Sequence, residues 1–136
     1  MEFDNLTSRC AVRLPDTTEP EQYVLGIVLR SPHLAAQAGN IPPEAFSNTI
    51  RAGVWRALLE EYQKTKKAPV PFALVDKLAT TAEERQAIMM VVANAMDIPV
   101  AANGKNLDEF AGHLLDRWSR RRLVELAYEL AGQAVD

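Results

Sequence analysis

The sequence predicts an all-α protein, a small orthogonal domain of five to seven helices that ends in a long C-terminal helix. Apolar residues recur at helical spacing in most segments after the first 16 residues, and capping residues and prolines separate those segments. No window alternates apolar and polar residues as a half-buried strand does. The chain of 136 residues has the length of one domain. We expect a flexible leader over residues 1–16 and a helical domain over residues 17–136, from which residues 119–136 project as an interaction helix.

The first predicted helix begins near Thr18, which can cap it, with Glu21 at the capping-box position. Pro32 stops this helix, because the residue before a proline is driven out of the helical region. Short helical turns are expected over residues 32–37 and from Pro42 on, since proline is well tolerated at a helix start.

The central helix is predicted to begin at Ser47 or Asn48, either of which can act as its cap. Two prolines within residues 69–71 are expected to close it. A short helix should follow over residues 72–78.

Two longer helices complete the predicted domain. Thr81 and Glu84 have capping-box spacing and open a helix that reaches about Met96. Asn106 caps the last and longest helix, which runs to about Ala134.

Each predicted helix has an apolar face that must be buried against another element. The residues expected to pack together are Leu25, Ile27, Val28, Phe46, Val54, Leu58, Phe110 and Leu114. Aromatic and methionine residues at helical spacing usually fill a core, so we also assign to it Trp55, Tyr62, Met89 and Met90.

Composition and charge exclude several classes of protein. Eighteen acidic residues against fifteen Lys and Arg give a net charge of -3, which disfavours strong nucleic-acid binding by the domain as a whole. No apolar run approaches the ~20 residues that span a bilayer, and the acidic N-terminus lacks the apolar segment of a signal peptide. We therefore expect a cytoplasmic protein with no membrane partner.

No constellation of residues favours catalysis. The glycine-rich loops GxxxxGK[ST] and GxGxxG, which bind nucleotide phosphates, are absent from the sequence. Cys10, the only cysteine, could act as a nucleophile only with a fixed base such as His33 or His113. Glu109, His113 and Asp116 share a face of the last helix and could ligate a divalent metal, but a solvated helix face is the ordinary interpretation. We expect no enzyme activity, no cofactor and no metal.

An arginine cluster, Arg117 and residues 120–122, separates two apolar stripes of the last helix. The first stripe ends at Trp118 and faces the predicted core. The second stripe has near-heptad spacing and consists of Leu123, Leu126, Ala127, Leu130 and Ala134. The cluster is either a phosphate-binding patch or the point at which the helix leaves its domain. Since no predicted element remains to cover the second stripe, we favour contact with a partner protein.

Several segments of the sequence, taken in order, resemble the segments of a known helical domain. The segment "PDTTEPEQYVLGIVLRSP" matches an opening helix with an "E-x-x-V-L-G" pattern, and "IPPEAFSNTIRAGVWRALLEEYQKTKKAPV" matches a loop, a phenylalanine and the helix after it. "FALVDKL" and "NLDEFAGHLLDRWSRRRLVELAYELAGQA" match a short and a long helix. In this order, over about residues 15–134, the chain resembles the N-terminal domain of DnaB-type replicative helicases. Ile50 replaces a family histidine, Pro71 replaces an aspartate and residues 80–96 lack a Gly-Gly pair, so a diverged phage or plasmid version is expected.

The resemblance implies an interaction domain without catalysis. In the family this domain precedes a linker and a RecA-like ATPase domain, builds a ring collar that is a trimer of dimers, and receives the C-terminal domain of primase. The long helix is the first arm of the hairpin that makes the pairing. We therefore expect self-association, and docking of primase or another replication protein, through Arg121, Arg122, Leu123, Leu126, Tyr128 and Leu130. The alternative expectation is a small helical DNA-binding regulator that uses Arg117 and residues 120–122.

Overall fold

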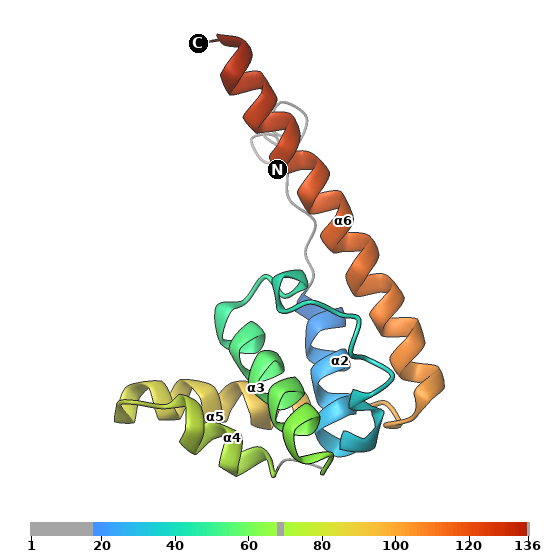
Figure 1. The fold of residues 1–136 in the computed structure, drawn as a ribbon, viewed down its shortest axis with the longest axis vertical. Helices are drawn as coiled ribbons and strands as arrows, with labels where there is room; N and C mark the ends of the chain where they lie inside the picture. Colours follow the sequence, from blue (N-terminus) through green and yellow to red (C-terminus); the bar gives the residue numbers. More distant parts are fainter. Residues whose placement is uncertain (1–17, 68–69, 136) are drawn as a thin grey trace, which may run out of the picture.

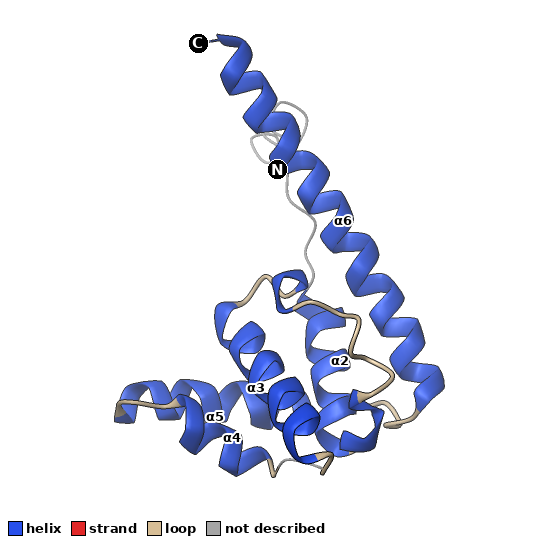
Figure 2. Ribbon diagram, viewed as in Figure 1, coloured by secondary structure: helices blue, strands red, loops and turns tan. Residues whose placement is uncertain are grey.

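The computed structural model describes residues 18–67 and 70–135, and within them all regular structure is helical, which confirms the predicted fold class (Figure 2). The elements are α2 (Thr18–Arg30), the 3-10 turns η1 (Pro32–Ala35) and η2 (Pro43–Ala45), α3 (Thr49–Thr65), α4 (Pro71–Leu78), α5 (Ala82–Met96) and α6 (Gly104–Val135). The elements from α2 to α5 form a group that we call the helical body, and α6 runs along it and continues well beyond it (Figure 1). No described helix is both long and apolar enough to cross a membrane. The predicted leader, with Cys10, lies outside the described residues.

Helix α2 lies at the centre of the helical body because it is apolar on almost every side. It contacts α3, α5 and α6. Its fully buried side chains include Val24, Leu25, Ile27 and Val28. At Gly26 the helix crosses α5 so closely that an added Cβ would lie 1.8 Å from the carbonyl oxygen of Ala95. The crossing of α2 and α5 therefore depends on the absence of a side chain at residue 26.

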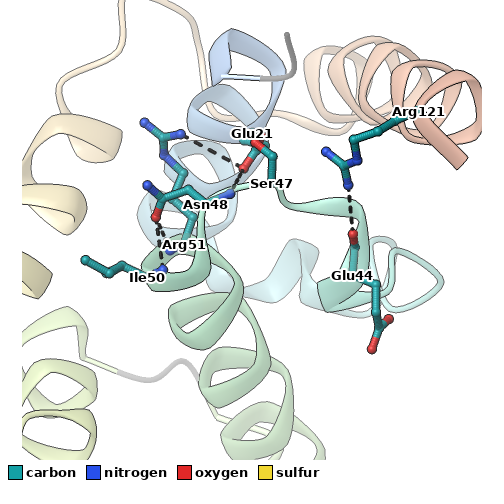
Figure 3. Close-up of polar contacts among 7 residues, drawn as sticks. All are labelled: Glu21, Glu44, Ser47, Asn48, Ile50, Arg51 and Arg121. Atoms are coloured by element: carbon teal, nitrogen blue, oxygen red, sulfur yellow. Dashed lines mark hydrogen bonds and ion pairs between the residues drawn. The ribbon is translucent and has the colours of Figure 1, made fainter. Parts of the chain in front are cut away.

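Glu21, which was predicted at a capping-box position, links α2 to α3. Its side chain is fully buried and reaches the start of α3 (Figure 3). The carboxylate accepts hydrogen bonds from the Ser47 hydroxyl at 2.6 Å and the Asn48 backbone N–H at 3.2 Å, and it lies 3.9 Å from the Arg51 guanidinium. The start of a helix has unpaired N–H groups and a positive dipole end, so the carboxylate is stabilised at the start of α3.

Asn48 caps α3, as one of the two predicted candidates. Its side-chain oxygen accepts hydrogen bonds from the N–H groups of Ile50 and Arg51, both at 3.0 Å. Farther along the helix Trp55 is fully buried, and its indole N–H donates to the carbonyl oxygen of Ile41 at 2.9 Å. The polar end of this aromatic side chain is thus satisfied inside the core.

Helix α3 ends before the prolines that were expected to close it. Its last residue is Thr65, and Lys66 has a left-handed backbone with φ 57°, which terminates the helix. Pro71 begins α4 rather than ending α3. The fixed φ of proline and its lack of an N–H suit the first position of a helix, which explains the difference.

The predicted capping box of α5 forms only in part. The Thr81 hydroxyl oxygen accepts a hydrogen bond from the backbone N–H of Glu84 at 3.1 Å, as a cap does. The Glu84 carboxylate, however, accepts a hydrogen bond from the Thr80 hydroxyl at 2.9 Å. The preceding threonine thus competes successfully for this acid.

The assignment of Met89 and Met90 to the core is wrong. Both are exposed, and Met90 retains 58% of its accessible surface. Helix α5 is apolar on most sides, whereas only the side with Ile88, Val92 and Ala95 is buried in the helical body. An apolar pattern without a polar face does not indicate which side of a helix is covered.

Helix α6 begins at Gly104, before the predicted cap Asn106. The side-chain oxygen of Asn103 accepts a hydrogen bond from the Asn106 N–H at 2.8 Å, so Asn103 takes the capping role. The Asn106 side chain in turn donates to the carbonyl oxygen of Ala101 at 2.8 Å. Two asparagines thus fix the turn that leads into α6.

The predicted core is confirmed apart from one residue at its edge. The buried residues include Leu25, Ile27, Val28, Phe46, Val54, Leu58 and Leu114. Phe110 is only partly buried, and its ring meets Tyr23 edge to face with centroids 4.5 Å apart. Trp55 is also in the core, and Tyr62 packs against it half-buried.

We expect Leu58→Ala to lower the free energy of unfolding by about 2–5 kcal/mol, because the fully buried side chain would leave a cavity in α3's contact with the core. Urea denaturation followed by circular dichroism measures the loss. Met90→Ala is the matched control, since Met90 is exposed on α5 and its truncation should change stability by about 0.5 kcal/mol or less. Equal effects of the two substitutions would contradict the placement of Leu58.

Candidate protein-interaction surface

The first half of α6 is attached to the helical body by one side. Leu107 and Leu114 are buried there, and Phe110 and Trp118 are partly buried against the same core. These residues follow a spacing of three and four, so they form one stripe along the helix. This is the stripe that was predicted to face the core.

Arg121 fixes α6 to the helical body near the point where the helix leaves it. Its side chain is 11% exposed, and its guanidinium donates a hydrogen bond to the carbonyl oxygen of Glu44 in η2 at 3.1 Å (Figure 3). The same guanidinium lies 3.9 Å from the Glu125 carboxylate. One of its terminal nitrogens, Nη1, is buried without a hydrogen-bond partner among the described residues. The structure therefore places Arg121 against the body, whereas the other predicted interface residues lie farther out.

Acidic neighbours accompany the other arginines of the cluster. Arg120 lies 3.3 Å from the Asp116 carboxylate, and Arg122 donates to the Glu125 carboxylate at 2.9 Å. Arg117 also has an interaction partner. These acids reduce the positive potential that phosphate contacts require, so the arrangement favours a polar junction over a nucleic-acid patch.

The part of α6 beyond this junction, residues 122–135, is called the outer segment below. It projects from the helical body (Figure 1). Its exposed apolar side chains are Leu123, Leu126, Tyr128 and Leu130. Leu123 and Leu130 retain 68% and 65% of their accessible surface. A concentration of exposed apolar residues of this kind marks an interaction site in a natural protein.

A shallow groove of about 340 Å³ runs along the outer segment. Its lining consists of Leu123, Val124, Ala127, Tyr128 and Ala131. Val124, Ala127, Tyr128 and Ala131 have the spacing i, i+3, i+4 and i+7, which are the four corners of a hole on a helix surface. In helix pairs a side chain of the facing helix enters such a hole. The groove thus offers one such hole, on a different side of the outer segment from Leu126 and Leu130.

The sequence predicted the exposed residues of the outer segment but not the full lining of the groove. Of the predicted interface residues, Arg122, Leu123, Leu126, Tyr128 and Leu130 are exposed on the outer segment. Val124 and Ala131 were not predicted, although their spacing around Ala127 was visible in the sequence. A search for four-residue holes in addition to the leucine seam would have found them.

The residues considered for metal binding lie on the exposed surface of α6. Glu109, His113 and Asp116 are solvent-accessible, and Asp116 is the partner of Arg120. Across residues 18–67 and 70–135, no three His, Cys, Asp or Glu side chains are grouped so that they could hold a metal ion. The arrangement is that of a solvated helix face with an ion pair.

A second exposed apolar surface lies on α5, away from α6 in Figure 1. Its lining consists of two alanines, two methionines and two polar residues, namely Ala82, Arg85, Gln86, Met89, Met90 and Ala93. Methionine is common on adaptable binding surfaces. Nothing in its charge pattern or surroundings specifies an occupant, in contrast to the outer segment of α6.

Comparison with known proteins identifies no relative: the chain matches no protein-family model, no curated protein and no solved structure.

Proposed function

We propose that this chain is a non-catalytic interaction and oligomerisation domain, and that the outer segment of α6 is its association surface. The observation that carries the proposal is the exposed leucine stripe on a helix that projects from its own domain. In water such a stripe is unfavourable for a monomer and favourable at an interface. Leucine and tyrosine beside arginine is also a composition found at protein interfaces.

The biological setting that we propose is DNA replication. Its support is the resemblance, in order and spacing of segments, to the N-terminal domain of DnaB-type helicases. On this proposal the domain takes part in the assembly of a helicase ring and docks primase or another replication protein. Calorimetric titration with the C-terminal domain of a primase from the same source tests the second part, and an absence of heat and of co-elution would contradict it.

We expect Leu126→Asp combined with Leu130→Asp to abolish self-association, because each change puts a charge where apolar surface must be buried. The wild-type chain should show a mass that rises with concentration in the micromolar range when measured by multi-angle light scattering.

Phe72→Asp is the matched control for this variant. Phe72 is a similarly exposed apolar residue on α4, so its replacement introduces a charge at a distance from α6. Circular dichroism should show that both variants keep the wild-type helicity. Association of the folded double variant at the wild-type strength would mean that the interface lies elsewhere.

A further inference from the structure

We infer that the outer segment of α6 pairs antiparallel with the same segment of a second copy of this chain, with Leu123 of each helix facing Leu126 of the other. The inference rests on the proposed function and specifies its partner, orientation and register. Three features of α6 carry it, namely an unobstructed face, the heptad positions of its charges and the spacing of its leucines.

One face of α6 stays exposed along the whole helix, on the side away from the helical body. This face consists of the exposed residues Lys105, Asp108, Gly112, Asp116, Ser119, Leu123, Leu126 and Leu130. The buried residues Leu107 and Leu114 lie on the other side. A partner helix can therefore lie along this face and extend past Leu123 toward the body without meeting the body of the first copy.

The leucines on this face have heptad spacing. Leu123 and Leu130 occupy equivalent a positions, and Leu126 occupies the d position between them. In this frame Arg122 and Glu129 occupy the g positions, which flank the seam and form ion pairs between helices. The basic g residue thus lies nearer the body and the acidic one nearer the end of the helix.

The distribution of charge selects the antiparallel orientation. In an antiparallel pair g positions face g positions, so Arg122 of each copy meets Glu129 of the other, and the contact occurs twice by symmetry. In a parallel pair g positions face e positions, which puts Arg122 opposite Ala127 and Glu129 opposite Ala134. Only the antiparallel arrangement gives each charge an opposite charge.

The same charges select the register. If Leu126 faced Leu130 instead of Leu123, the two copies of Glu129 would meet each other and repel. With Leu123 against Leu126, Leu130 lies over Ser119, a small residue on the exposed face that leaves room for it. Both residues can form the ion pair between the copies. Glu129 forms no ion pair among the described residues, and the Arg122 side chain is half-exposed beside Glu125.

The apolar part of the contact in this arrangement is short. The layers that contain a leucine lie within residues 119–130, which cover about 18 Å at 1.5 Å per residue. Two helices in contact over that length bury less than the ~1,200 Å² of stable complexes. The pair should therefore be weak and reversible at micromolar concentration, and its strength should depend on the two symmetry-related ion pairs.

Charge reversal tests this pairing. Sedimentation equilibrium at low salt, where ion pairs are least screened, is measured for the wild type, for Arg122→Glu, for Glu129→Arg and for an equimolar mixture of the two variants. Each variant alone should dimerise about five- to tenfold more weakly, since both ion pairs become repulsive. In a mixed dimer the glutamate introduced at position 122 of one variant faces the arginine introduced at position 129 of the other. The unchanged Glu129 of the first variant faces the unchanged Arg122 of the second, as in the wild type. Dimerisation should therefore return to about the wild-type strength.

Glu109→Arg is the matched control, because it makes the same substitution as Glu129→Arg on the exposed side of α6 but outside the overlap. It should leave dimerisation unchanged. If the wild type dimerises but the variants dimerise equally well, or the mixture gives no recovery, the antiparallel register is wrong and self-association through α6 still stands. If the wild type stays monomeric at every concentration, self-association itself fails, and the pairing fails with it.

Discussion

Gly26→Ala is expected to destabilise the fold by about 3 kcal/mol or more. The added Cβ would lie 1.8 Å from the Ala95 carbonyl oxygen and 2.8 Å from the Ile98 Cδ1 atom. A backbone oxygen cannot rotate away as a side chain can, so α2 and α5 must separate. Because α2 also contacts α3 and α6, the separation would disturb packing through most of the helical body.

Gly53→Ala is the control for this prediction. Gly53 also lies inside a helix, α3, but an added Cβ there would meet nothing within 4 Å. Alanine should therefore stabilise the protein by about 0.5–1 kcal/mol, because it has a higher helix propensity and restricts the unfolded chain. Urea denaturation of both variants gives opposite signs if the close crossing is real. A small, equal change at both glycines would show that α2 and α5 do not approach so closely.

The second large effect is expected at Glu21, the only charged residue among the fully buried side chains that are described. Glu21→Ala removes the acceptor of the Ser47 hydroxyl and of the Asn48 N–H, and it leaves the Arg51 guanidinium without this counter-charge. Loss of one member of a buried ionic cluster typically costs about 3–5 kcal/mol. Thermal or urea unfolding measures the change.

Glu21→Gln separates the charge of this residue from its shape. The amide keeps an acceptor oxygen but has no negative charge for Arg51 or for the positive end of the α3 dipole. Its cost should be smaller than that of alanine but still measurable. A loss below about 1 kcal/mol for Glu21→Ala would contradict the role of Glu21 as the polar link between α2 and α3.

The elements of the fold were predictable because their signals are local. Asn48 and Thr81 begin helices through hydrogen bonds to residues two or three positions away. Lys66 shows the limit of such reasoning. It ends α3 in a left-handed conformation that nothing in its residue type demands, whereas the prolines that follow suggested a later end.

Features that depend on distant partners were not predictable. Gly26 resembles any glycine in a helix until α5 is packed against it. Glu21 has the spacing of a local cap, but its side chain also binds residues 26 and 27 positions away. Met90 has the pattern of a core residue because the sequence does not reveal which side of α5 is covered. The candidate surface on α6 was predictable, since its leucines repeat along one helix and required no knowledge of other elements.

The anchoring of Arg121 has a mechanical consequence for α6. Beyond this residue the helix continues for about 21 Å to Val135, and an α-helix is stiff over that length. A tilt of about 10° at the contact between Arg121 and Glu44 would displace the far end by roughly 4 Å, given a rise of 1.5 Å per residue. The outer segment therefore converts a small tilt at the junction of α6 with the helical body into a large movement at its far end.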